Sequence, residues 1–399
     1  MKRKGSLGPG VLIAAAFIGP GTVTTCTAAG VGFGYGLLWA LLLSVIATGI
    51  LQEMSARLGL VSRRGLADAV KTEVSWPLLK NVILGTILIA ILVGNAAYEG
   101  GNIGGATLGL QALFGTTYSG FYPWCIAGLA FILLYFGNSK VLELVFTGLV
   151  FVMSLAFVIT ALLTKPDTWE LLKGMFVPAL PNDGILTVIA LVGTTVVPYN
   201  LFLHASLVHQ KWKSPAALKQ VRVDTAIAIA VGGLVSMAIV LCGTAAKTGA
   251  VNGVMDMAEA LVPLFGEGAR WFIGIGLFAA GITSAITAPL AAAYVANSCF
   301  GWNADIKDFR FRSVWMGVLL IGAFFMSFDI NPIKVIQLAQ IANGLLLPSV
   351  AFFLLWAVNR NSLMGRYGNT MAQNVLGVLI VLVSIVLGLK SILAVFGIL

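Results

Sequence analysis

Long runs of apolar residues constrain this chain more than any other feature of its sequence. Hydrophobic residues make up 59% of its 399 residues and charged residues only 10%, and the mean hydropathy is +0.98. No soluble domain of this size satisfies such a balance, and most runs reach the ~20 residues that a membrane-spanning helix needs. We therefore predict an all-α polytopic membrane protein with eleven transmembrane helices, at residues 8–34, 37–61, 80–113, 121–138, 141–164, 185–212, 221–248, 268–298, 312–329, 333–358 and 371–397.

The net charge of +9 could suit a nucleic acid, but its distribution points to the membrane instead. If the N-terminus is cytoplasmic, most Lys and Arg residues fall on that side, among them Lys2, Arg3, Arg63 and Arg64. Cytoplasmic loops of membrane proteins carry this excess. We predict an integral protein of a bacterial inner membrane, with the N-terminus inside and the C-terminus outside. Its surroundings are the lipid bilayer, and no nucleic-acid partner is expected.

Two of the apolar segments are interrupted near their middle. The first contains Gly19-Pro20-Gly21-Thr22, and the sixth contains Val197-Pro198-Tyr199-Asn200. Proline removes a backbone donor and clashes with the preceding turn of a helix. Backbone groups left unpaired at membrane depth are tolerated only where they line a cavity or are buried in protein. Such breaks in matching positions of two halves indicate the binding site of a secondary transporter.

The segments divide into five, five and one, and an odd number in each set inverts the second set relative to the first. We predict inverted repeats at residues 1–184, with the connecting loop, and 185–358, followed by a loop and a last helix at 359–399. The polar link that begins at Lys165-Pro166-Asp167 is expected on the outer face.

The four cysteines, Cys26, Cys125, Cys242 and Cys299, lie in apolar segments without metal-ligand spacing, which favours a packing role. The chain has no phosphate-binding loop of the G-x-x-x-x-G-K-[ST] type and no serine elbow. We therefore expect neither ATP-driven transport nor an enzyme, and no cofactor.

Several motifs resemble those of the SLC11 (Nramp) divalent-metal transporters. Residues Pro198–Val208 look like that family's sixth-helix motif, Gly19-Pro20-Gly21 looks like its first-helix motif, and Ser55–Gly59, Asp224-Thr225 and Leu363–Gly365 match in order. The resemblance covers nearly the whole chain. It implies a LeuT-type fold, a 5+5 inverted repeat with broken helices 1 and 6, and a site between those half-helices.

The same motifs depart from the family where its metal ligands lie. In the family's Asp-Pro-Gly-Asn motif, Gly19 stands for the aspartate and Thr22 for the asparagine. In its Ala-x-x-Met-Pro-His-Asn motif, Thr194, Val197 and Tyr199 stand for the alanine, the methionine and the histidine. The resemblance also places Leu346 where the family has a tenth-helix glutamine. Carboxylate, thioether and amide ligands are thus all expected to be missing.

A desolvated divalent cation at the bilayer midplane is strongly disfavoured without a counter-charge. Hydroxyls, amides and the positive N–H end of the half-helix after Gly21 remain. We therefore predict no metal site and a small organic anion as substrate, citrate or another di- or tricarboxylate, alone or as a metal complex. The predicted substrate-binding residues are Gly19, Gly21, Thr22, Thr25, Thr194, Val197, Tyr199, Asn200 and Asn343.

Two ionisable residues lie inside the apolar segments and form a candidate proton relay, with protons as the coupling ion. Glu99 is in the third segment, and His204 is one helical turn beyond Asn200. An equally weighted interpretation makes both structural, with Glu99 paired to Arg57 or to a backbone donor and His204 bonded to a carbonyl.

Two rival functions remain open. One is transport of a divalent cation, Mg²⁺ or Mn²⁺, held through waters, backbone carbonyls and Asn200. The other is a transport-inactive receptor or scaffold. The breaks at Pro20 and Pro198 argue against a scaffold, which has no reason to keep unpaired backbone.

Overall fold

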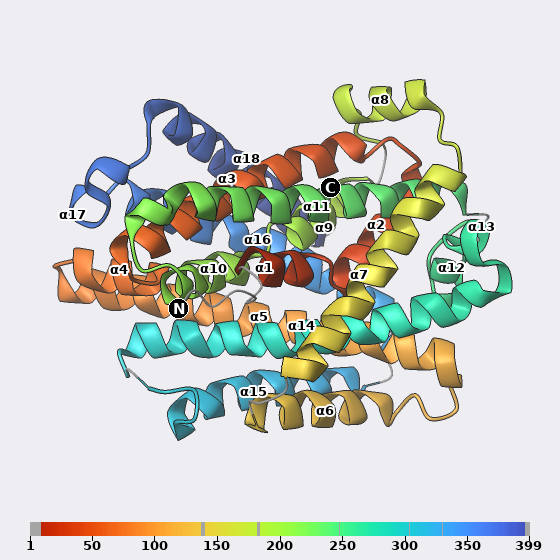
Figure 1. Cartoon of the computed structure of the whole chain (residues 1–399), viewed down its shortest axis with the longest axis horizontal. Coiled ribbons are helices and arrows are strands. Elements are labelled where there is room, and N and C mark those ends of the chain that lie inside the picture. The colour runs from red at the N-terminus through yellow and green to blue at the C-terminus, as the bar shows by residue number, and fades with distance from the viewer. Residues whose placement is uncertain are drawn as a thin grey trace.

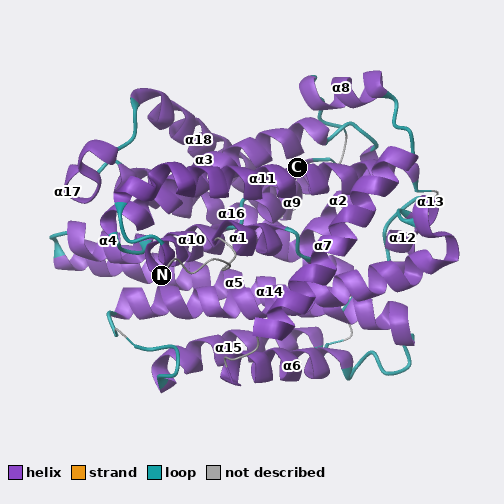
Figure 2. Ribbon diagram, viewed as in Figure 1, coloured by secondary structure: helices purple, strands orange, loops and turns teal. Residues whose placement is uncertain are grey.

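The computed structural model describes residues 9–136, 140–181, 184–246, 248–302, 304–328 and 330–395. Over these ranges the chain is helical and contains no strand, as Figure 2 shows. The all-α class predicted from the sequence is confirmed. The basic residues Lys2 and Arg3, used to orient the chain, lie outside the described residues.

Most of the chain lies in long helices joined by short connecting ones (Figure 1). The longer elements are α1 (Pro9–Phe17), α2 (Pro20–Phe33), α3 (Leu38–Ser62), α5 (Pro77–Phe114), α6 (Tyr122–Phe136), α7 (Lys140–Leu163), α9 (Ile185–Thr195), α10 (Pro198–Lys211), α11 (Leu218–Ala245), α14 (Ala269–Phe300), α15 (Phe309–Met326), α16 (Pro332–Val358) and α18 (Met371–Val395). The connecting helices are α4 (Leu66–Glu73), α8 (Thr168–Phe176), α12 (Val254–Glu259), α13 (Val262–Phe265), α17 (Asn361–Met364) and the 3-10 turns at Pro215–Ala217, Gly266–Gly268 and Gly365–Tyr367.

Nine helical stretches in the described part of the chain are long and apolar enough to cross a membrane, and α9 and α10 together count as one of them. Helix α6 is a shorter apolar helix, and α1 with α2 forms another interrupted pair. This pattern agrees with an integral membrane protein. The exact count of eleven spans and the division into repeats at 184 and 358 stay predictions.

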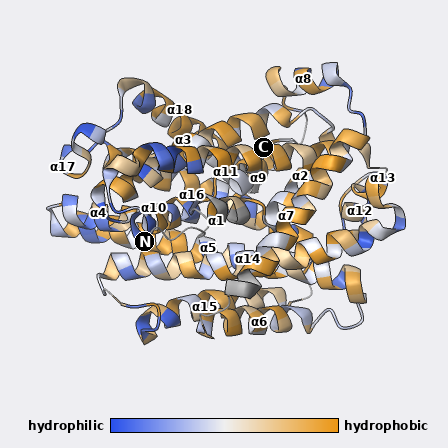
Figure 3. Ribbon diagram, viewed as in Figure 1, coloured by the Kyte–Doolittle hydropathy of each residue, from blue (hydrophilic) through white to orange (hydrophobic). Residues whose placement is uncertain are grey.

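The molecule has a buried centre and an apolar outer surface. Helix α14 packs along α5, α11 packs against α2 and α3, and α16 packs against α5, α9 and α18. Outward-facing positions of the long helices hold large apolar side chains, among them Phe151, Leu320 and Val383. Figure 3 shows hydrophobic residues throughout the long helices and hydrophilic ones gathered at ends such as α4 and α17. Such an exterior suits lipid rather than water.

Small residues allow the central helices to approach one another closely. The glycines of α5 illustrate this, because a Cβ at Gly105 would collide with the ring of Pro20, which begins α2. On the facing helix, a Cβ at Gly281 would lie 2.6 Å from the Ala106 Cβ. The close approach of α2 to α5 therefore depends on the missing side chain at Gly105.

The predicted outer link contains a short helix of its own. Asp167 caps α8, because its Oδ1 accepts the backbone N–H groups of Trp169 at 2.8 Å and Glu170 at 3.1 Å. One side of α8 packs on the end of the α2–α3 connection, where Gly174 lies against the carbonyl of Tyr35. The link therefore rests on the segment that leaves the first broken helix.

Candidate substrate site at the paired helix breaks

The first break lies between α1 and α2. Gly19 is extended, with φ −92° and ψ −179°, and Pro20 is the first residue of α2, where its missing N–H leaves no helical bond unmade. The Thr22 hydroxyl donates to the Phe17 carbonyl at 2.5 Å and so pairs one carbonyl at the end of α1. Since a hydroxyl has one hydrogen, Thr22 Oγ1 must accept from the Thr194 hydroxyl, which lies 2.9 Å away.

The second break lies between α9 and α10. The backbone leaves the helix at Val196 (ψ 73°), is extended at Val197, and re-enters a helix at Pro198. The Thr195 hydroxyl bonds the Leu191 carbonyl of its own helix at 2.9 Å, and the Ser44 hydroxyl of α3 is also in hydrogen-bond contact with it. The Thr22–Thr194 pair joins this break directly to the first one.

Helix α16 passes beside both breaks and brings an amide that the sequence analysis missed. A Cβ at Gly21 would collide with the side-chain amide of Gln340, and a Cβ at Gly193 would collide with the Gln340 carbonyl. Asn343 Nδ2 donates to the Gly193 carbonyl at 3.4 Å, so the predicted residue Asn343 does reach the second broken helix. Glycine is required at 193 because only bare backbone leaves room for the backbone of α16, whereas a side chain at 21 would have to displace the Gln340 amide.

The assignment of the lost tenth-helix amide to Leu346 was therefore incomplete. Leu346 packs against Gly94 of α5, whereas Gln340, one and a half turns earlier, lies beside Gly21. The available signal was an amide inside the apolar segment 333–358, since polar groups within membrane helices mark sites.

Several oxygens at the breaks are buried and have no hydrogen-bond partner. They are Tyr199 Oη, Asn200 Oδ1 and Gln340 Oε1, with Thr25 Oγ1 one turn along α2. Buried polar atoms are nearly always paired, and each exception needs an explanation. The Tyr98 ring of α5 packs edge-on against the Tyr199 ring, with 5.4 Å between the ring centroids. The predicted residues Thr22, Thr194, Tyr199 and Asn200 thus all lie at the two breaks, and the Thr22–Thr194 hydrogen bond joins one break to the other.

The breaks expose both poles of the helical backbone. Helices α2 and α10 begin there with positive N–H ends, and helices α1 and α9 end there with negative carbonyl ends. Both starting helices have proline first, which removes one donor from each N–H end. The predicted anion would use the N–H ends, whereas the rival prediction of a divalent cation uses the carbonyl ends.

Thr25 also borders a cavity that leads away from the first break. This cavity has a volume of about 300 Å³ and lies between α2, α9 and α16, with Thr187, Lys334 and Gln337 among its lining residues. Helices α9 and α16 both begin near it. The cavity therefore lies one helical turn from the first break, on the side of the molecule where α9 and α16 start.

The two predicted relay residues have different surroundings. Glu99 is fully buried in α5, where Oε2 accepts from Asn102 Nδ2 at 3.1 Å and Oε1 has no partner. His204 Nδ1 lies 2.7 Å from Gln52 Oε1 of α3, and its Nε2 has no partner. Glu99 is therefore bonded to an amide rather than to Arg57, and the relay stays a prediction.

Arg57 belongs to a separate charged network at the far end of α3. Glu53 Oε1 accepts hydrogen bonds from Arg57 Nε at 3.0 Å and from Arg222 Nε at 2.8 Å. Arg57 also donates to the Tyr367 carbonyl at 2.5 Å and to Asn369 Oδ1 at 2.6 Å. Glu53 therefore pairs with both Arg57 and Arg222.

Among the residues that the structure describes, no three His, Cys, Asp or Glu side chains lie close enough together to hold a metal ion. In that part of the chain, the groups that the breaks offer to a cation include neutral oxygens of backbone carbonyls, hydroxyls and amides.

Two interrupted helices that meet inside a bundle of membrane-length helices are the arrangement of the LeuT-type fold. The chain has such neighbours among solved structures: MhsT in complex with L-phenylalanine (TM-score 0.62, 14% identity, 99% of each chain covered) and the transporter Mhp1 (TM-score 0.57, 15% identity, 97% of this chain and 92% of that one). The predicted LeuT-type fold is confirmed.

The chain belongs to the Nramp family. The model of Natural resistance-associated macrophage protein-like sequences matches residues 10–394. The "Divalent metal cation transporter MntH" of Acidiphilium cryptum is 31% identical over 90% of this chain and 83% of its own length, and that of Yersinia enterocolitica is 30% identical over 98% and 94%. A crystal structure of the Eremococcus coleocola manganese transporter matches with a TM-score of 0.78 at 20% identity, over 97% of this chain and 86% of that one.

The predicted organic-anion substrate is wrong. The full-length relatives are named as divalent metal cation transporters, and the similar structures include manganese transporters. The physical reason for the error lies at the breaks. The absence of a carboxylate was weighed too heavily against a cation, since carbonyl ends and unpartnered amide oxygens also attract cations. The relatives' names agree with the rival prediction of a divalent cation.

Proposed function

We propose that this protein is a secondary transporter of a divalent metal cation, Mg²⁺ or Mn²⁺, held between the two breaks by neutral oxygens and retained water. The observation behind this proposal is the set of buried, unpartnered oxygens Tyr199 Oη, Asn200 Oδ1 and Gln340 Oε1 beside the carbonyl ends of α1 and α9. An anion would need donors, and these atoms include two amide oxygens that can only accept.

The donor set favours a hard cation. Carbonyl, amide and hydroxyl oxygens suit Mg²⁺ and Mn²⁺, whereas thioether and imidazole suit softer metals. Val197 and Tyr199 occupy the positions where the family motif has a methionine and a histidine, so neither soft ligand is present there. We therefore infer that selectivity is shifted toward hard divalent ions.

The absence of a carboxylate predicts weak binding. The carbonyl ends of α1 and α9 contribute partial charges of roughly −0.5 each, but the positive N–H ends of α2 and α10 at the same breaks offset them, so the backbone supplies little net counter-charge. Waters retained by the ion lower the cost of desolvation, and Mg²⁺ in particular gives up its waters reluctantly. We therefore infer that the divalent cation binds with a Kd near the millimolar range, as oxygen sites with few charges do.

We further infer that protons are the coupling ion and that the N-terminus is cytoplasmic. Glu99 and His204 support the first point, because each keeps one unpartnered buried polar atom on a helix next to the breaks. The excess of basic residues in the loops on one side supports the second.

Uptake into proteoliposomes tests the proposal. We expect Mg²⁺ and Mn²⁺ to enter in a saturable manner, Cd²⁺ to compete poorly, and citrate without metal not to enter. A folded protein that moves none of these ions would favour the receptor alternative, and preferential Cd²⁺ uptake would contradict the neutral-oxygen site.

The variant Gly19→Asp sharpens this test. Gly19 is extended, a conformation that any residue adopts, so the change is sterically acceptable on the backbone. A carboxylate at the first break should lower the KM for Mn²⁺ by roughly tenfold, because it adds a full charge near the ion. A raised KM in a variant with wild-type thermal stability would argue against cation binding at this break.

A further inference from the structure

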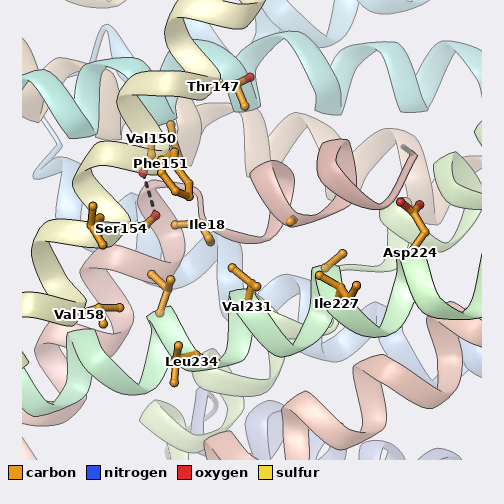
Figure 4. A pocket seen from close by; sticks show the side chains of 14 residues that line it. Ile18, Thr147, Val150, Phe151, Ser154, Val158, Asp224, Ile227, Val231 and Leu234 are labelled. Carbon is orange, nitrogen blue, oxygen red and sulfur yellow. Dashed lines mark hydrogen bonds between the residues drawn. The ribbon is translucent and has the colours of Figure 1, made fainter. Parts of the chain in front are cut away.

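A second, apolar space lies on the outer flank of α1. It is a cleft of about 440 Å³ between α1, α7 and α11, and Figure 4 shows its walls. Ile18 stands at its α1 wall, Phe151 and Val158 at its α7 wall, and Val231 and Leu234 at its α11 wall. Ile18 directly precedes the extended residue of the first break. The cleft is therefore next to the hinge of the broken helix but outside the substrate site.

The cleft remains apolar even beside the serine in its wall, Ser154. The Ser154 hydroxyl donates to the Val150 carbonyl of its own helix at 2.7 Å, as the dashed line in Figure 4 marks. This hydroxyl therefore offers no free donor to a ligand. Among the described residues that line the cleft, Asp224 alone is formally charged.

The cleft opens toward the hydrocarbon of the bilayer. Helices α7 and α11 are membrane spans, and the lining residues Phe151, Ile227 and Leu234 are 64%, 59% and 59% exposed. At this depth the surrounding solvent is lipid. An empty apolar space of this size would lose the dispersion contacts of its walls, and an acyl chain from the surrounding lipid would restore them.

We propose that this cleft is a specific binding site for a phospholipid, with one acyl chain between α1, α7 and α11 and an amine-bearing headgroup beside Asp224. This site is separate from the breaks and does not depend on which ion the protein carries. The acyl chain fills the space along Val231 and Leu234, and the ammonium of an ethanolamine headgroup pairs with the carboxylate.

Asp224 is placed for this role at the end of the cleft. Its Oδ2 accepts the backbone N–H of Gly10 at 2.7 Å, in the first turn of α1. A carboxylate accepts more than one hydrogen bond, so Asp224 can pair with an ammonium while it holds Gly10. A Cβ at Gly10 would lie 2.6 Å from the Asp224 carbonyl, which shows how closely α1 lies on α11 here.

The bound lipid would stabilise α1 against α11. Helix α1 is only nine residues long and ends at a break, so its position depends on its neighbours. Phe17 packs tightly on Gly232 of α11, and Ala14 and Ile18 form the remaining wall of the cleft. A chain in the cleft contacts α1 on the flank that α11 leaves uncovered.

Native mass spectrometry of the full-length protein tests the proposal. The protein is released from nanodiscs that contain equal amounts of phosphatidylethanolamine and phosphatidylglycerol with identical acyl chains. We expect one retained phosphatidylethanolamine per wild-type chain. Val231→Trp fills the cleft and should reduce this retention by roughly tenfold, whereas Leu320→Trp, on the exposed face of α15, should leave it unchanged.

Two further variants keep the result interpretable. Ile227→Trp replaces Val231→Trp if the latter does not purify as a monodisperse protein. Asp224→Asn keeps an acceptor for Gly10 and removes the charge, so it should abolish the preference for the ethanolamine headgroup while one lipid is still retained. Equal lipid retention in wild type and the filled variants, or equal retention of both headgroups by the wild type, would overturn the proposal.

Discussion

The helix breaks and the Glu53–Arg57 network lie in the same helical bundle and treat their polar groups in opposite ways. In the network, Arg57 is almost fully buried and meets Glu53, Tyr367 and Asn369 through its guanidinium. At the breaks, neutral oxygens of Asn200 and other residues are equally buried and have no partner. The network contains charged side chains whose hydrogen bonds are formed within the protein. The breaks present neutral groups, several of which lack a hydrogen-bond partner.

This difference separates structure from function. A satisfied buried network contributes to the folded state, and removing one member leaves the others unpaired. A buried acceptor without a partner destabilises the protein when no ion is bound, and a bound cation would supply the missing partner. The comparison predicts that variants of the network lose stability, whereas variants of the breaks lose transport.

The largest effect is expected for Arg57→Met. It leaves the Glu53 carboxylate with Arg222 alone and the Tyr367 carbonyl unpaired, and should cost roughly 2–4 kcal/mol. The measurement is the midpoint of thermal unfolding in detergent. The control is Lys173→Met, whose exposed pair with Glu170 at 3.8 Å should be worth less than about 1 kcal/mol. Equal shifts in both variants would remove the distinction between the two regions.

The second effect is expected for Gly21→Ala. The added methyl group collides with the Gln340 amide, so overpacking should destabilise the protein by about 1–3 kcal/mol and displace a cation ligand. Thermal unfolding and Mn²⁺ uptake are measured together. Gly85→Ala on α5 is the matched control, since a Cβ there meets nothing within 4 Å. Wild-type uptake by Gly21→Ala would mean that Gln340 is not part of the site.

The third effect is expected for Asn200→Ala. The Asn200 oxygen has no partner in the protein, so its loss should change the unfolding midpoint little but raise the KM for Mg²⁺ roughly tenfold. Kinetics of uptake at several ion concentrations measure this. A drop in stability without a change in KM would assign Asn200 to the structure instead.

The smallest effect is expected for Tyr199→Phe. Its hydroxyl is buried and unpartnered, so the variant should be as stable as the wild type or more stable by up to about 1 kcal/mol. Cation uptake should fall only a few-fold, because a hydroxyl is a weaker ligand than an amide oxygen. A strong loss of stability would show that the hydroxyl has a partner in the folded protein.

The architecture followed from the sequence because membrane spans depend on composition along the chain. The lengths of the apolar runs and the positions of Pro20 and Pro198 predicted the helices and both breaks, and α2 and α10 do begin at those prolines. The residues Gly19, Thr22, Thr194 and Asn200 were found in the same way, as polar or glycine positions at the breaks.

The substrate did not follow, because its recognition depends on groups that no side-chain motif reports. The carbonyl ends of α1 and α9 come together only when two distant segments meet, as Thr22 and Thr194 do. Gln340 lies more than 300 residues from Gly21 along the chain, and only the packing of α16 brings them together. Counting charged side chains alone therefore favoured an anion and gave no weight to these acceptors.

The central claim is that a hard divalent cation binds between the two breaks through neutral oxygens. Anomalous X-ray diffraction from crystals soaked in Mn²⁺ tests it most directly. The account predicts a peak between Thr22 and Asn200, with oxygen ligands at roughly 2.0–2.6 Å and at least one retained water. No peak at the breaks, or a peak with sulfur or imidazole ligands elsewhere in the bundle, would contradict it.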